Sequence, residues 1–262
     1  MPKVQGVTIG APVWLDLSTS DLDKATAFYT GLFGWNVLNT GPDFGSYHIA
    51  SKGEAGVGGI MQKTEDEKAS GVPDAWMMYF AVEDAKATAE AIRNAGGQIL
   101  FDPMDVGGLG VMAIAVDPGG AGFGLWQPGQ HTGFDVLAEA GAPCWFELLT
   151  RDFAASTAFY AKVFGVELVD MQFGDEGGSY KTLNIDGGER AGIMDATNVL
   201  GEEDPPAWFL YLGVNDADEA AAKVTELGGT VLAPVAETPH GRFAPVSDPN
   251  GGVFGIIGVG DA

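Results

Sequence analysis

The feature that most constrains this chain is a long internal repeat. The segment "TAFYTGLFGW" at 26–35 returns as "TAFYAKVFGV" at 157–166, an offset of 157 − 26 = 131 in a chain of 262 residues. Around these segments, the 27 residues that start at Ala11 match the 27 that start at Ala142 at 12 positions. Self-similarity of this length indicates a duplicated structural unit. We therefore expect two similar halves, each large enough to bury its own core.

Within each half, a strand, a helix and several strand-like runs follow one another twice. In the first half, "VWLDL" precedes a helical pattern with Ser20 or Asp21 as its N-cap, and "AWMMYFAVED" precedes an alanine-rich helical pattern. Short apolar runs broken by glycines and by "DPGG" predict the remaining strands. The sequence thus predicts an α+β fold of four βαβββ units. We expect domains at 1–128 and 142–262, joined by a linker at 129–141.

Composition argues against several classes of partner. The formal net charge of −23 and the pI near 4.1 disfavour nucleic acid and anionic membrane surfaces, because like charges repel. The single cysteine, Cys144, cannot form an intrachain disulfide. No apolar run approaches the roughly 18 residues that span a bilayer, and the N-terminal segment lacks a signal-peptide pattern. We expect a soluble, cytoplasmic protein whose partner is a small molecule.

The spaced residues "D…A..FY…FG", followed by "V.D…A…GG" and "DP.G", resemble the vicinal oxygen chelate superfamily. That superfamily includes glyoxalase I, extradiol dioxygenases, fosfomycin-resistance enzymes and bleomycin-binding proteins. The likeness covers residues 11–128 and 142–258, and the tandem form with "W.ELLT.D" is similar to an actinobacterial group labelled hydroxylases, which includes a mycobacterial antigen. The resemblance implies paired βαβββ units whose strands curl into a cup over a ligand. Because one chain carries four units, we expect a monomer, with a homodimer as the alternative.

The resemblance also implies where a metal would bind, and this chain carries other residues there. The corresponding positions are Trp14 and Trp145 on first strands, Trp76 and Trp208 on fifth strands, and Gly124 and Gly255 after the "DP.G" turns. Neither indole nor glycine supplies the imidazole, carboxylate or thiolate donors that a first-row metal needs. The phosphate-binding glycine motifs of nucleotide sites are also missing. We therefore expect no metal and no other cofactor.

Side chains that face the cups are the candidates for ligand binding. Strand alternation places Trp14 and Asp16 toward the first cup, and Trp145 and Glu147 toward the second. The complete set of ligand-binding candidates is Trp14, Trp76, Trp145, Trp208, Tyr47, Tyr180, Arg242 and Trp126. They predict aromatic-walled sites for a flat or apolar ligand with few polar anchors. A structural alternative is that the indoles only fill the space of the missing metal site, and that Arg242 only pairs with a nearby acid.

Asp16 and Glu147 are the candidate catalytic acids. Each lies in mid-strand between apolar neighbours, where a carboxylate is costly unless it is paired. Glu147 is the stronger candidate, although it could instead accept hydrogen bonds that merely hold the sheet. The sequence predicts a metal-independent protein that binds a small organic metabolite or antibiotic-like compound. The alternatives are a lyase, isomerase or hydroxylase in which Glu147 or Asp16 moves a proton, and a surface-recognition or antigenic role.

Overall fold

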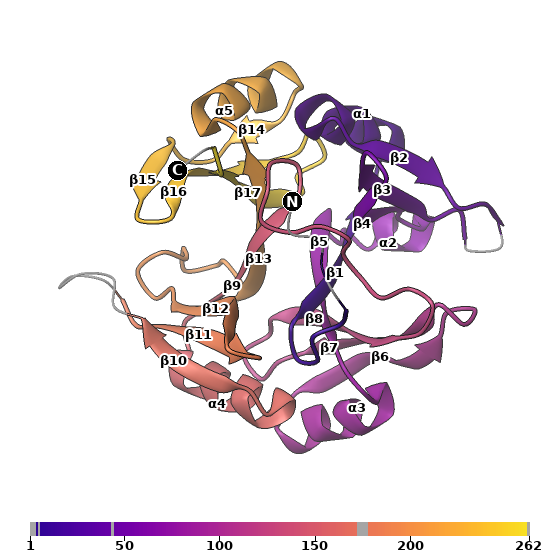
Figure 1. Ribbon diagram of the computed structural model, residues 1–262, viewed down its shortest axis with the longest axis vertical. Helices are drawn as coiled ribbons and strands as arrows, with labels where there is room; N and C mark the ends of the chain where they lie inside the picture. Colours follow the sequence, from indigo (N-terminus) through magenta and orange to yellow (C-terminus); the bar gives the residue numbers. More distant parts are fainter. Residues whose placement is uncertain (1–3, 5, 43–44, 172–177, 261–262) are drawn as a thin grey trace.

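The protein is described here by a computed structural model that covers residues 4, 6–42, 45–171 and 178–260. Each half forms one mixed β-sheet with helices packed beside it (Figure 1). The first half contains β1 (Pro12–Thr19), α1 (Leu22–Phe33), β2 (Asn36–Asn39), β3 (His48–Lys52), β4 (Ala55–Gln62), α2 (Glu65–Ala69), β5 (Ala75–Ala81), α3 (Ala85–Asn94), β6 (Gln98–Asp105), β7 (Gly110–Val116) and β8 (Gly122–Pro128).

The second half repeats this plan. It contains β9 (Pro143–Thr150), α4 (Phe153–Phe164), β10 (Glu167–Met171), β11 (Tyr180–Ile185), β12 (Gly188–Asp195), β13 (Ala207–Val214), α5 (Ala217–Glu226), β14 (Thr230–Val231), β15 (Ala236–Thr238), β16 (Gly241–Ser247) and β17 (Val253–Gly258). Four βαβββ units are present, and the last carries the extra short strand β15. The predicted α+β architecture is confirmed.

In each sheet, two units meet through their first strands. The strand orders are β2-β3-β4-β1-β5-β8-β7-β6 and β10-β11-β12-β9-β13-β17-β16-β14, with β15 beside β16. The central pairs β1–β5 and β9–β13 are antiparallel, whereas β1–β4 and β5–β8 are parallel. This arrangement puts the first strand of every unit in the middle of a sheet, where its side chains are the most enclosed.

The repeated decapeptides form the last turns of equivalent helices and the residues that end them. Helix α1 begins after Asp21, whose side chain accepts a hydrogen bond from the Lys24 backbone N–H. It ends at Gly34, which adopts the left-handed conformation with φ 69°. Helix α4 is capped in the same way by Asp152 and by Gly165, with φ 63°. Glycine adopts this conformation without the steric penalty that a Cβ brings, so the sequence fixes both ends of each helix.

The helix-covered faces of the two sheets meet in one core. Helix α1 contacts α5, and α3 contacts α4, so each contact joins the two halves (Figure 1). Phe80 of β5 lies with its ring centroid 4.6 Å from that of Phe164 in α4 and 5.2 Å from that of Trp208 in β13. We call the opposite face of each sheet, the one away from this core, its cup face.

Two buried hydrogen-bond chains cross the junction between the halves. Trp76 Nε1 donates to the Tyr29 hydroxyl at 3.0 Å, and this hydroxyl donates to Asp248 Oδ2 at 3.1 Å. The second chain links Trp208, Tyr160 and Asp117 at 2.8 and 3.1 Å. Both aspartates belong to the "DP.G" turns, and their Oδ1 atoms accept hydrogen bonds from backbone N–H groups of the same turn. The turn of each half is therefore hydrogen-bonded to the first helix of the other half, α4 or α1.

The expectation that Trp76 and Trp208 face the cups is wrong. Directly opposite residues of an antiparallel pair point to the same face of a sheet. Trp76 lies opposite Leu17, and Trp208 lies opposite Leu148. Both leucines are completely buried on the helix-covered face. The indoles consequently belong to the core between the halves. For these two tryptophans the structure agrees with the alternative that they only fill space.

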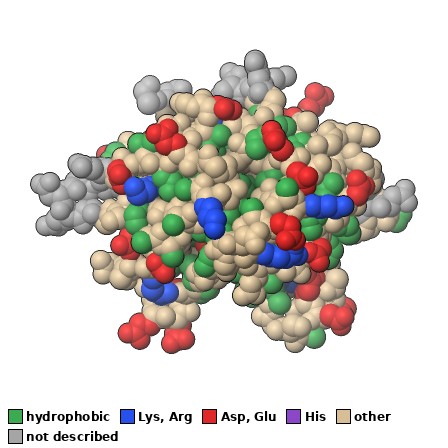
Figure 2. All heavy atoms as spheres, turned by 90° about the horizontal axis from the view of Figure 1, so that it is seen from below, with side chains coloured by type: hydrophobic (Ala, Val, Ile, Leu, Met, Phe, Trp, Pro, Cys, Tyr) green, Lys and Arg blue, Asp and Glu red, His purple; other side chains and the backbone are tan. Residues whose placement is uncertain are grey.

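The surface reflects the acidic composition. On the face shown in Figure 2, carboxylates are scattered over the molecule with a few Lys and Arg side chains among them. Within the described part of the chain, no helix has both the length and the apolarity that crossing a bilayer requires.

Candidate functional site

The first sheet carries a cluster of hydrogen-bonded side chains on its cup face. Trp14, Asp16, Tyr47 and Tyr79 make up this first acid–tyrosine cluster. Trp14 Nε1 donates to the Tyr47 hydroxyl at 2.8 Å, and that hydroxyl donates to Asp16 Oδ1 in a short hydrogen bond. Tyr79 lies opposite Trp14 in the β1–β5 pair and also hydrogen-bonds to Asp16. The carboxylate thus has two phenols as its partners.

The second sheet repeats the arrangement with a longer acid. The second acid–tyrosine cluster consists of Trp145, Glu147, Tyr180 and Tyr211. Trp145 Nε1 donates to the Tyr180 hydroxyl at 2.8 Å, and the Tyr211 hydroxyl donates to Glu147 Oε2 at 3.0 Å. Tyr180 hydrogen-bonds to Glu147 as well. The predicted cup-facing positions of Trp14, Asp16, Trp145 and Glu147 therefore agree with the structure.

Glycines on neighbouring strands make room for the tyrosine rings. A Cβ atom at Gly192 would lie 1.8 Å from the Tyr180 hydroxyl, and one at Gly255 would lie 2.6 Å from the Tyr211 ring. In the first half, a Cβ atom at Gly59 would lie 1.6 Å from the Tyr47 hydroxyl, and one at Gly124 would lie 2.1 Å from the Tyr79 ring. A side chain at these positions would clash, because Cβ atoms do not approach other heavy atoms so closely. Part of the high glycine content therefore serves the two clusters.

Burial changes the acidity of both clusters. Desolvation raises the pKa of Glu147, and hydrogen bonds from Tyr180 and Tyr211 and the nearby charge of His240 oppose that rise. Desolvation likewise raises the pKa of Asp16, against hydrogen bonds from its own tyrosines. The pKa values of all four phenols are raised, through desolvation and the neighbouring carboxylate. Each cluster therefore keeps its phenols protonated and holds a carboxyl group that binds a proton more tightly than usual.

The donor set of the clusters does not fit a metal of the kind that the family resemblance implies. The positions expected for acidic ligands hold Gly124 and Gly255, and the space beside them is filled by the rings of Tyr79 and Tyr211. Each cluster holds one carboxylate, surrounded by neutral phenols and an indole. Among the residues that the structure describes, no three His, Cys, Asp or Glu side chains come close enough to hold a metal ion. A first-row metal needs more donors of these types than either cluster provides.

The two clusters differ in their exposure. Trp14 and Tyr79 are 6% and 4% exposed, whereas Trp145 and Tyr211 are only partly buried. The segment between the halves covers Trp14, because it places His131 against this indole with the ring centroids 4.3 Å apart. The tryptophan and the fifth-strand tyrosine are therefore more exposed in the second cluster, whereas Tyr180 there is buried and its counterpart Tyr47 in the first cluster is partly exposed.

Arg242 and Trp126 are the two remaining ligand-binding candidates. Arg242 forms a salt bridge with Asp218 of α5 at 2.8 Å. The next residue, Phe243, contacts the Tyr211 ring on the cup face, so Arg242 points to the opposite face and pairs with an acid, which is the structural alternative for this residue. Trp126 does lie near Trp14, but its indole N–H donates to the His131 carbonyl oxygen at 3.0 Å. That donor is consequently already used by the chain.

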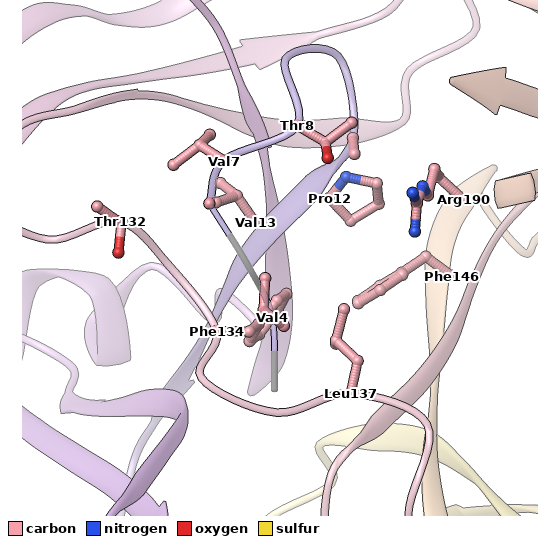
Figure 3. Close-up of a pocket in the computed structure, with 12 residues that line it drawn as sticks. Val4, Val7, Thr8, Pro12, Val13, Thr132, Phe134, Leu137, Phe146 and Arg190 are labelled. Atoms are coloured by element: carbon pink, nitrogen blue, oxygen red, sulfur yellow. The ribbon is translucent and has the colours of Figure 1, made fainter. Parts of the chain in front are cut away.

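A small cavity lies at the junction between the halves. It measures about 70 Å³ and is lined by Pro12, Val13 and Phe134 together with Phe146 and Arg190 of the second half (Figure 3). Sites for drug-sized ligands measure roughly 300–1,000 Å³, so this cavity is too small for such a molecule. A shallower depression of about 230 Å³ lies between the start of α3 and the end of α4. Neither contains Asp16 or Glu147.

Sequence reasoning missed Tyr79, Tyr211 and His131. The two tyrosines follow the fifth-strand tryptophans by three residues in "WMMY" and "WFLY", an odd spacing that puts indole and phenol on opposite faces. Recognising that Trp76 belongs to the core would have pointed to Tyr79. His131 lies in the linker, and no periodic pattern predicts where a linker side chain comes to rest.

Comparison with known proteins assigns the fold to a family. Residues 11–125 and 143–255 match the Glyoxalase/Bleomycin resistance protein/Dioxygenase superfamily. The chain belongs to this superfamily. Over 260 residues it is 36% identical to CFP32 of Mycobacterium tuberculosis, provisionally named a glyoxylase, with 98% of each chain covered. It is 34% identical to the anthracycline biosynthesis protein DnrV of Streptomyces peucetius, covering 95% of this chain and 93% of DnrV.

Solved structures show the same fold at low sequence identity. The Mn(II)-bound glyoxalase of Novosphingobium aromaticivorans matches with a TM-score of 0.65 and 14% identity, covering 97% of this chain and 83% of that one. The 2,3-dioxygenase LapB of Pseudomonas sp. KL28 matches with a TM-score of 0.64 and 12% identity, covering 98% and 94%. These likenesses establish the superfamily fold. The residues of the clusters, described above, differ from a metal-binding set.

Proposed function

We propose that the second acid–tyrosine cluster binds a flat aromatic small molecule without a metal. One observation carries the proposal. The partly exposed rings of Trp145 and Tyr211 flank a carboxyl group, on Glu147, that is itself only 9% exposed. An apolar surface with one or two desolvated polar anchors is the usual composition of a small-molecule site.

The side chains of this cluster have complementary tasks. The indole of Trp145 offers an apolar face, and offset or edge-on contacts between aromatic rings contribute about 0.5–1.5 kcal/mol beyond their buried area. Glu147 orients the ligand through a hydroxyl or amine group, because its carboxyl group accepts a hydrogen bond when ionised and donates one when protonated. Tyr180 and Tyr211 hold that carboxyl group in place through their hydrogen bonds.

The relatives support a ligand of this shape. DnrV, and DauV of Streptomyces sp. strain C5, both carry the name anthracycline biosynthesis protein, and the chain is 34% identical to each. Anthracyclines contain a flat, hydroxylated, polycyclic core. The proposal that no metal takes part is supported by this chain's own residues. The phenols and glycines of the clusters occupy the positions where metal ligands would be expected.

A second candidate function is proton transfer by Glu147, as in a lyase, isomerase or hydroxylase. It is favoured by the raised pKa of this carboxyl group, because a general base works best when its pKa lies closer to the working pH. In that case Glu147 is a catalytic residue, and Tyr180 and Tyr211 are positioning residues. The two candidates differ in the fate of the ligand, which a binding protein returns unchanged.

Native mass spectrometry of the protein purified directly from the cells that make it tests the proposal. We expect a retained small molecule whose released form has an aromatic absorption spectrum. The Trp145→Ala variant, purified in parallel, should have lost it, whereas Trp208→Phe should retain it because Trp208 belongs to the core. Equal retention by wild type and Trp145→Ala would contradict the proposed site. A product that differs in mass from the ligand supplied would favour the enzyme.

A further inference from the structure

The segment that joins the two halves is fastened over the first cluster rather than hanging free. The His131 backbone N–H donates to the Leu109 carbonyl oxygen at 2.9 Å, and the Phe134 backbone N–H donates to that of Val13 at 3.0 Å. Between them, Gly133 has φ 108° and lies so close to β1 that a Cβ atom would be 2.3 Å from the Val13 side chain. Residues 131–134 therefore form a strap pressed against the first sheet.

This strap carries one side chain into contact with the tryptophans of the cup face. The His131 ring meets Trp14 edge-on, with centroids 4.3 Å apart and an interplanar angle of 85°. It also meets Trp126, with centroids 5.5 Å apart and an angle of 68°. The Trp126 indole N–H holds the His131 carbonyl oxygen, which fixes the histidine at its backbone. A half-buried aromatic ring of the chain itself thus lies beside the first acid–tyrosine cluster.

The second half has the same cluster but another residue in place of Trp126. Trp145 corresponds to Trp14, whereas the residue equivalent to Trp126 is Ile257, because 126 + 131 = 257. Trp145 is partly exposed there, whereas Trp14 is buried under the strap. Among the described residues, the two halves therefore present one buried indole with the His131 ring against it, Trp14, and one partly exposed indole, Trp145.

We infer that His131 occupies, in the first half, the place that a ligand ring takes beside Trp145 in the second. The chain then has one ligand site, at Glu147, and this site takes planar, uncharged aromatic rings that meet the indole edge-on. This inference rests on the proposed function of the second cluster. Burial lowers the pKa of His131, which agrees with a ring that is held uncharged. The acidic composition would otherwise suggest a cationic ligand.

The inference is tested by removing the His131 ring through substitution and supplying free imidazole in its place. In His131→Gly, free imidazole at about 100 mM should raise the melting temperature by ~2–5 °C, the shift expected for a site with millimolar affinity in a protein of this size. His131→Phe, which keeps a ring in place, and the wild type offer imidazole the Trp145 site alone, so their rise should be smaller than that of His131→Gly. If His131→Gly does not fold, His131→Ala serves for the same comparison. A folded Gly or Ala variant that responds to imidazole no more than wild type overturns the inference.

A second arm separates this inference from the proposed function. With 1,4-dihydroxyanthraquinone as probe, calorimetry should give one site per chain in wild type and two in His131→Gly. One site in both proteins, with no greater response of His131→Gly to imidazole than that of wild type, would leave the Glu147 site standing and overturn the role of His131. No site in wild type, together with imidazole rescue of His131→Gly, would overturn the proposed function and support the enclosed ring. Two sites in wild type would also overturn the inference.

Discussion

The hydroxyl group of Tyr160, in the second half, donates to the carboxylate of Asp117, in the first, at 3.1 Å. Tyr29 and Asp248 make the same contact in the opposite direction. Each tyrosine is completely buried and accepts a hydrogen bond from a tryptophan of its own half. Reciprocal tyrosine–aspartate hydrogen bonds therefore join the two halves. We expect the two halves to unfold together.

Removing one of these hydroxyl groups tests this connection between the halves. Tyr160→Phe removes the hydrogen-bond donor of Asp117 and the hydrogen-bond acceptor of the Trp208 indole. Because both of these side chains are buried, the variant should lower the free energy of unfolding by about 1–3 kcal/mol. Urea unfolding followed by tryptophan fluorescence and by circular dichroism measures this change. Tyr29→Phe should cost a similar amount. Two separate transitions in the wild type would show that the halves are independent.

The tryptophans should fall into two classes. Trp208→Phe deletes a buried hydrogen bond at the junction and should cost about 1–3 kcal/mol of stability without changing the affinity for ligand. Trp145→Phe should stay within about 1 kcal/mol of wild type in stability and lose ligand affinity. Urea unfolding and a ligand titration on both variants check this. The reverse assignment would mean that the ligand binds at the junction rather than on the cup face.

The raised pKa of Glu147 has a consequence for stability that depends on pH. Above the unfolded value of about 4.5, the folded state holds the proton more tightly than the unfolded state does. Stability contributed by this group is thus lost as the pH rises toward the folded pKa and stays lost above it. The amide side chain introduced by Glu147→Gln cannot titrate. The free energy of unfolding of this variant should therefore increase relative to that of wild type as the pH rises from 4.5.

Urea unfolding of both proteins at several pH values measures this difference. The free energy of unfolding of Asp16→Asn should also increase relative to that of wild type as the pH rises, because burial also raises the pKa of Asp16. A difference that stays constant from pH 4.5 to 8, or that shrinks, would show that Glu147 is not desolvated in solution.

Metal binding should be weak and should not be coupled to the ligand. After treatment with chelator, titration with Zn²⁺ or Mn²⁺ should show no stoichiometric binding at sub-micromolar affinity, because each cluster offers one carboxylate among phenols. The affinity for 1,4-dihydroxyanthraquinone should be the same with and without chelator. Tight stoichiometric metal binding that raises the affinity for the probe would contradict the metal-independent site.

The sequence was sufficient for the fold because the duplication, the helix caps and the glycine turns are local signals. Asp21 and Gly34 set the ends of α1 through contacts within a few residues, and the same holds for α4. Strand alternation also placed Trp14 and Glu147 correctly, since a single strand fixes which side chains share a face.

The sequence was insufficient where a position depends on another strand. The register of β5 against β1 puts Trp76 opposite Leu17, and nothing within "AWMMYF" states that register. Arg242 was misplaced for a related reason, since its partner Asp218 lies in a helix 24 residues away. The position of His131 depends on a linker that crosses β1, a contact that no local pattern encodes.

The most direct test of the account compares the two equivalent acids with one ligand. In wild type, 1,4-dihydroxyanthraquinone should bind at one site and quench tryptophan fluorescence. Glu147→Gln should weaken binding by about tenfold or more, since a hydrogen bond to a charged group contributes about 1.5–3 kcal/mol, with no loss in melting temperature. Asp16→Asn should bind as wild type does, because His131 already lies against the Trp14 indole of its cluster. Unchanged affinity in Glu147→Gln, or a loss confined to Asp16→Asn, would contradict the central claim that the second cluster is the binding site.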